Sequence, residues 1–212
     1  MKCILLQAPG EILEGEKELS LLGFDYTSYP TSQQVDQLLD KRYEEFSSFL
    51  GVHPQGCDKP YVRSLRISFA RMLLDPQFND DDLIIFGESD ATPIIEEPTL
   101  RNFMEKNLRE HPETDVFRLF HELTDYPAGS SISPNQLTLE PYNTDWYTRG
   151  TPYVWGTHAL VIPREKREKI ARIFLEYRLP IDTALEAASG AGEINMMITG
   201  INLFYQKPRT AP

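Results

Sequence analysis

Short apolar runs and longer amphipathic segments alternate along this chain. The apolar runs are bounded by polar residues, Gly or Pro, and predict buried strands at 2–8, 83–86, 116–120 and 155–162. Residues 195–205, punctuated by a glycine, predict a final strand or a pair of strands. A short segment of alternating aromatic and polar residues predicts one more strand at 24–29. Apolar residues at helical spacing predict helices at 11–22, 31–50, 61–74, 97–108, 163–177 and 180–190. Strands that alternate with helices predict an α/β fold, with a mostly parallel sheet flanked by helices.

Residues 124–153 interrupt this alternation. They are polar, rich in Pro, Ser, Asn, Tyr and Thr, and have little periodicity. We expect a variable loop there, because long segments without clear elements are usually functional or mobile. The 212 residues suit a single domain over 1–206, with a flexible tail at 207–212.

Charge and hydropathy exclude several classes of partner. The formal net charge of −11 argues against nucleic acid, whose binding requires Lys and Arg to neutralise phosphates. No apolar run approaches the roughly 20 residues of a membrane span, so no transmembrane segment is predicted. The first residues lead directly into a strand pattern rather than a signal peptide, and the expected location is the cytoplasm.

An acidic turn is the most informative candidate for chemistry. Glu88, Ser89 and Asp90 come directly after the apolar run 83–86 and Gly87. Ligands of open α/β sheets bind at the carboxyl ends of strands. Carboxylates at such a place are suited to a hard divalent cation, Mn²⁺ or Mg²⁺, that also holds a diphosphate. The alternative is an ordinary acidic turn after a strand, which the spacing alone does not exclude.

Two later motifs add polar groups to predicted elements. Gly156, Thr157 and His158 lie at an apolar strand, where the histidine could bind a metal or a sugar hydroxyl, or could be a core side chain with satisfied nitrogens. Asp182 follows Pro180 at the start of a predicted helix. It could cap that helix, or act as a general base that deprotonates an acceptor hydroxyl.

Taken in order, these motifs resemble glycosyltransferase family 25, the lipooligosaccharide galactosyltransferase-like group. Members of that family have a strand ending in Glu-Asp-Asp-Ala, then a Gly-Thr-x-Ala segment that leads into a helix, and later Pro-x-Asp before another helix. The corresponding segments here are 86–91, 156–163 and 180–182. The resemblance runs from about residue 63 to residue 182.

The resemblance implies a GT-A-like fold and a metal-dependent, inverting glycosyltransferase of the kind used in lipooligosaccharide biosynthesis. The enzyme would move a sugar, a galactose-like hexose, from a UDP-sugar to a hydroxyl of a glycan acceptor. In that interpretation Glu88 and Asp90 hold Mn²⁺ or Mg²⁺, and Asp182 is the catalytic base. The donor or acceptor pocket would be lined by Ser89, Gly156, Thr157 and His158.

Two departures from the family pattern keep other functions open. Ser89 stands where the family has its middle acid, and Phe69 stands where a helix of the family carries a histidine. They motivate the alternative of a catalytically degenerate GT-A-like binding or assembly module. A less favoured alternative is a metal-dependent nucleotidyltransferase or phosphohydrolase that uses the same carboxylates. The sequence defines no oligomeric state.

Overall fold

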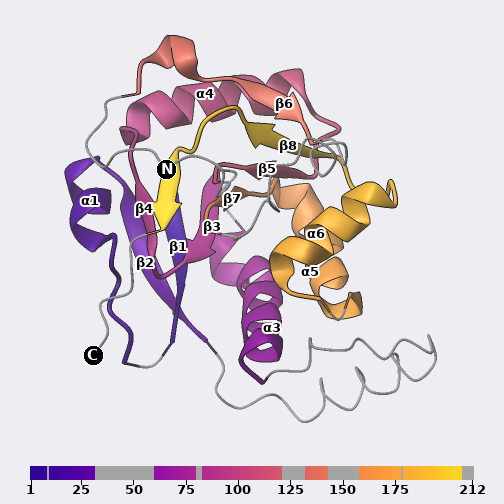
Figure 1. The fold of residues 1–212 in the computed structure, drawn as a ribbon. Coiled ribbons are helices and arrows are strands. Elements are labelled where there is room, and N and C mark those ends of the chain that lie inside the picture. The colour runs from indigo at the N-terminus through magenta and orange to yellow at the C-terminus, as the bar shows by residue number, and fades with distance from the viewer. Residues whose placement is uncertain are drawn as a thin grey trace, which may run out of the picture.

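The computed structural model describes residues 1–8, 10–31, 60–79, 83–120, 132–142, 158–177 and 179–206. Its main elements, drawn in Figure 1, are β1 (Lys2–Gln7), α1 (Glu16–Leu21), β2 (Asp25–Pro30), α3 (Pro60–Leu74), β3 (Ile84–Glu88), β4 (Ala91–Pro93), α4 (Glu97–Glu110), β5 (Val116–Arg118), β6 (Leu139–Pro141), β7 (Leu160–Val161), α5 (Arg167–Glu176), α6 (Ile181–Gly190), β8 (Met196–Thr199) and β9 (Phe204–Gln206). Single turns of 3-10 helix lie at Pro76–Phe78, Pro134–Gln136 and Arg164–Lys166.

A seven-stranded sheet forms the centre of the protein, in the order β2-β1-β3-β7-β5-β8-β6. Strands β2, β1, β3, β5 and β8 run in one direction, and β7 and β6 run against them. The predicted mostly parallel sheet is therefore confirmed. A second, small sheet pairs β4 with β9 in antiparallel fashion.

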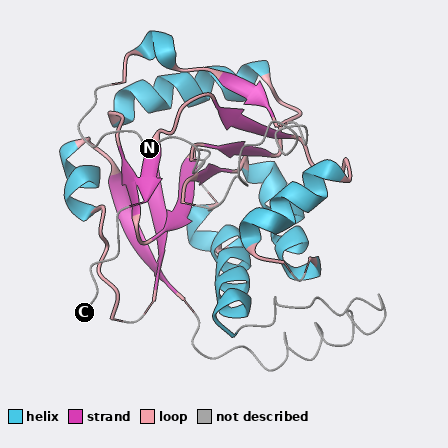
Figure 2. Cartoon of the chain, viewed as in Figure 1, coloured by secondary structure: helices cyan, strands magenta, loops and turns pink. Residues whose placement is uncertain are grey.

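Helices cover both faces of the large sheet, because successive residues of its strands point to opposite sides. Ile84 and Phe86 of β3 belong to one apolar core, which α3, α5 and α6 complete. Ile85, between them, belongs to the other core, together with residues of α1, α4 and the small sheet. Figure 1 shows α3, α5 and α6 gathered together, apart from α1 and α4, and Figure 2 shows the helices arranged around the strands. The predicted α/β class, with flanking helices, is confirmed.

The first helix is shorter than its apolar pattern predicts. It begins at Glu16 rather than at residue 11. The preceding residues form a loop that is bonded elsewhere: the amide of Glu11 donates to the carbonyl of Ala8, and the amide of Glu14 donates to the carbonyl of Ser89. The first is a local turn bond and the second joins a distant segment, and both use amides that lie ahead of the helix, which is consistent with the later start.

The second half of the chain also differs in detail from the prediction. The described part of the expected loop 124–153, residues 132–142, contains β6, which pairs antiparallel with β8 at the sheet edge. Its three residues are too few to show an alternating pattern. The segment 195–205, predicted as a final strand or a pair of strands, is a pair, and its members β8 and β9 lie in different sheets.

Other predictions fall on positions outside the described residues. These are most of the helix expected at 31–50, the remainder of the 124–153 loop, the start of the strand expected at 155–162, and the tail 207–212. Among the described helices, none combines the length and the apolar character that a membrane span requires.

Candidate metal centre

The carboxyl ends of the parallel strands bring together residues from distant parts of the chain. The parallel strands β1, β3, β5 and β8 all end on this side of the sheet, called here the carboxyl edge. Strand β7 begins there because it runs in the opposite direction. Leu160 of β7 pairs with Phe86 of β3 on one side and with Arg118 of β5 on the other. Glu88 lies two residues after Phe86, and His158 lies two residues before Leu160. Both are thereby carried to the same edge.

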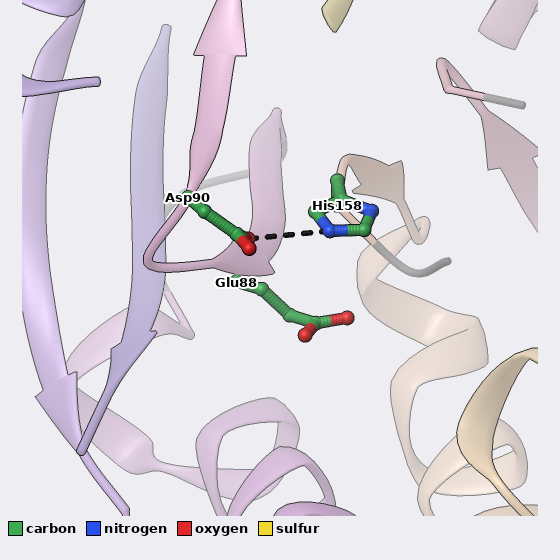
Figure 3. A group of neighbouring side chains, drawn as sticks. All are labelled: Glu88, Asp90 and His158. Atoms are coloured by element: carbon green, nitrogen blue, oxygen red, sulfur yellow. Dashed lines mark ion pairs between the residues drawn. The ribbon is translucent and has the colours of Figure 1, made fainter. Parts of the chain in front are cut away.

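Glu88, Asp90 and His158 form a group that is able to hold a metal ion. One ligand atom from each lies within 4.8 Å of the other two. Nε2 of His158 is 3.2 Å from Oδ1 of Asp90, the contact drawn as a dashed line in Figure 3. Asp90 and His158 are 1% and 5% exposed, and Glu88 is half-buried, so the group has a protected side and an accessible side. Two carboxylates and an imidazole are a suitable donor set for a divalent cation.

Close packing fixes the backbone and the ring of His158. A Cβ atom on Gly87 would lie only 2.1 Å from the carbonyl oxygen of His158, so the end of β3 presses directly against that peptide. On the other side, the ring of Phe120 meets the imidazole edge-to-face, with centroids 4.5 Å apart. Neither neighbour allows the histidine to move far from the acidic turn.

A second layer of side chains holds the acidic turn itself. The Gln206 side chain donates from Nε2 to Oδ2 of Asp90 over 2.9 Å, and the pairing of β9 with β4 places it there. The Ser89 hydroxyl donates to Oε2 of Glu11 over 3.0 Å. Sequence reasoning missed Glu11 and Gln206, because neither belongs to a motif and each contacts the turn across a long stretch of chain.

A buried charged pair lies beside this edge, on the face covered by α6. Arg118, the last residue of β5, is fully buried, and its Nη1 lies 3.3 Å from Oε1 of Glu186. Burial lowers the pKa of the Arg118 guanidinium, and the negative charges of Glu186 and Asp182 oppose that shift. Asp182 precedes Glu186 by one helical turn, so both acids lie on the face of α6 that is turned toward Arg118.

The remaining predicted site residues have different placements. Asp182 is not the N-cap of α6: Pro180 has that position, and Oδ1 of Asp182 accepts a hydrogen bond from the adjacent amide of Thr183 over 2.8 Å. The capping interpretation is wrong because the helix begins at Ile181, two residues before Thr183, where a helix capped by Asp182 would begin. Ser89 is 4% exposed. Gly156 and Thr157 lie outside the described residues.

Comparisons with known proteins give little further constraint. No family model matches the chain, and no curated protein matches it. Among solved structures, A197 from STIV is similar with a TM-score of 0.43 and 13% identity, over 98% of this chain and 86% of that one. Mouse xyloside xylosyltransferase 1, in its apo form, is similar with a TM-score of 0.39 and 11% identity, over 91% of this chain and 70% of that one. The resemblance to family 25 therefore rests on the sequence motifs alone.

Proposed function

We propose that this chain is a metal-dependent glycosyltransferase with a GT-A-like fold, and that it moves a hexose from a UDP-sugar to a hydroxyl of a glycan. The observation that carries the proposal is the group of Glu88, Asp90 and His158 at the carboxyl edge of the parallel strands. Such an edge is the usual ligand site of open α/β sheets. The ordered motifs of the sequence supply the substrate class.

In this proposal the carboxylates of Glu88 and Asp90 and the imidazole of His158 hold the cation. A bound divalent cation would neutralise the charge that develops on the departing nucleoside diphosphate. Imidazole nitrogen is a poor ligand for Mg²⁺, which prefers oxygen, so the donor set favours Mn²⁺ of the two. Ser89, Gly156 and Thr157 complete the donor or acceptor pocket.

Asp182 is the proposed general base. Its carboxylate would take the proton from the acceptor hydroxyl as that oxygen attacks the sugar from the side opposite the diphosphate, which inverts the configuration. Support comes from its place in the first turn of α6, one helical turn before Glu186, which lies 3.3 Å from the last residue of β5. The half-buried side chain is accessible enough to meet a substrate.

The test separates binding from chemistry. UDP binding, followed by calorimetry, is expected to require Mn²⁺ and to be lost in Asp90→Ala. Asp182→Asn is expected to retain UDP binding and lose sugar transfer. UDP binding that persists in the presence of a chelator would overturn the metal role. Mn²⁺-dependent UDP binding without turnover of any UDP-sugar would favour the degenerate binding module instead.

A further inference from the structure

We infer that Glu11 is a positioning residue of the metal centre, which holds the acidic turn through Ser89 and thereby sets its cation affinity. The inference rests on the proposed cation site. Nothing in the sequence motifs includes Glu11, which lies 78 residues from Ser89 in the chain. Its role follows from the contacts of one carboxylate oxygen.

Oε2 of Glu11 joins two segments that the fold brings together. It accepts a hydrogen bond from the hydroxyl of Ser89 over 3.0 Å and another from the amide of Ala8 over 2.9 Å. Ala8 directly follows β1, and Ser89 directly follows β3, the strand beside it in the sheet. The carboxylate therefore ties the ends of two neighbouring strands at the edge where the cation would bind.

Further bonds hold the Glu11 segment against the turn. The side chain of Gln7 donates to the backbone carbonyl of Glu11 over 2.6 Å. The amide of Glu14 donates to the carbonyl of Ser89 over 3.1 Å. Glu11 is thus fixed at its own backbone, while the turn is held at both the side chain and the backbone of Ser89.

These contacts give Ser89 a specific purpose between the two acidic ligands. A hydroxyl can donate to the Glu11 carboxylate, whereas an ionised acid at position 89 would face it as a like charge. The carboxylate of Glu11, from a different segment of the chain, therefore stands near the turn in addition to those of Glu88 and Asp90. Bonds to the residue between Glu88 and Asp90 hold the backbone from which both carboxylates extend. Loss of outer partners of a metal site typically costs about 10–100-fold in metal affinity.

The experiment is a titration of the full chain with Mn²⁺ alone, in which electron paramagnetic resonance measures the free ion. Glu11→Ala and Ser89→Ala are each expected to raise the Kd for Mn²⁺ by about 10–100-fold. If Glu11 acts through Ser89, the double variant should bind Mn²⁺ no more weakly than the weaker single variant. Glu105→Ala, which removes an exposed acid on α4, is the matched control and should retain the wild-type Kd.

Thermal unfolding of each variant separates positioning from folding. Ser89→Ala removes only one oxygen, so it keeps the inference testable if Glu11→Ala does not fold. A wild-type Kd for Mn²⁺ in either folded single variant would overturn the inference and leave the cation site intact. The same conclusion would follow if the increase in Kd of the double variant equalled the product of the two single increases. Absence of Mn²⁺ binding by the wild-type chain would instead overturn the proposed function, and this inference with it.

Discussion

Nε2 of His158 lies 3.2 Å from Oδ1 of Asp90, and this contact joins the turn after β3 to the residues before β7. The two side chains reach the same point from opposite strand directions. Oδ2 of Asp90 is engaged by Gln206, so Oδ1 is the oxygen that faces the histidine and the place where a cation would bind. The acid and the imidazole therefore belong to one candidate site rather than to two.

Replacement of His158 by alanine should weaken Mn²⁺ binding by at least about tenfold, because loss of a ligand should exceed the smaller end of outer-partner effects. Mg²⁺ binding should change less, since that ion gains little from a nitrogen ligand. Calorimetric titration with both ions measures the difference. Equal Mn²⁺ affinity in His158→Ala and the wild type would show that the histidine is not a ligand.

Gly87→Ala should disturb both stability and the metal centre. The new methyl group would meet the carbonyl oxygen of His158 at 2.1 Å, and a backbone atom cannot rotate away as a side chain can. We expect a loss of about 1–3 kcal/mol in the free energy of unfolding, measured with urea, and weaker Mn²⁺ binding. Gly192→Ala, at a positive φ of 74° with open space around it, is the control. It should lower stability but leave Mn²⁺ affinity unchanged.

Glu186→Ala should be strongly destabilising, by about 3–5 kcal/mol, because it removes the carboxylate paired with the buried Arg118 guanidinium and leaves the weaker influence of Asp182. The double variant Arg118→Met/Glu186→Leu removes both charges and fills the space with apolar groups, so it should lose much less. Urea unfolding of the two variants gives the comparison. Equal losses in both would show that packing, rather than charge, dominates at this position.

Tyr177 should make the protein lose stability in alkaline solution. Burial and a hydrogen bond from its hydroxyl to Glu193 raise the pKa of Tyr177 from 10.0 to about 12. The folded state therefore keeps a proton that the unfolded state loses above pH 10, and the free energy of unfolding should fall as pH rises from about 10 to 12. Burial also raises the pKa of Tyr29, in the same direction. Tyr177→Phe should flatten the profile of unfolding free energy against pH in part, and an unchanged slope would contradict the assignment.

Local apolar patterns were sufficient to predict most elements but not how they meet. The strand at β3 and the helices α3, α4, α5 and α6 follow from runs and spacings that lie within each segment. The direction of β7 cannot be predicted in this way, because the apolar pattern of its two residues is the same whether the neighbouring strands are parallel or antiparallel to it. In a wholly parallel sheet, the start of that strand would lie at the opposite edge from Glu88. Its reversal is what brings His158 to the acidic turn.

The outer partners of the turn show the same limit more strongly. Glu11 and Gln206 contact it across 78 and 116 residues of chain. Glu11 lay within a predicted helix, and Gln206 followed an ordinary strand pattern. Their contacts with the turn depend on the pairing of β1 with β3 and of β4 with β9, which joins segments that are far apart in the sequence.

The central position of β7 has a mechanical consequence. It has two residues, yet in the described sheet it is the link between β2-β1-β3 and β5-β8-β6. The described sheet therefore consists of two halves joined by β7, and the start of β7 lies at the candidate metal centre. A ligand held by Glu88 and His158 would tie β3 to the start of β7 and so strengthen the connection between the halves on one side. Slower exchange of the Leu160 and Val161 amide hydrogens with solvent deuterium when the ligand is bound would report that strengthening.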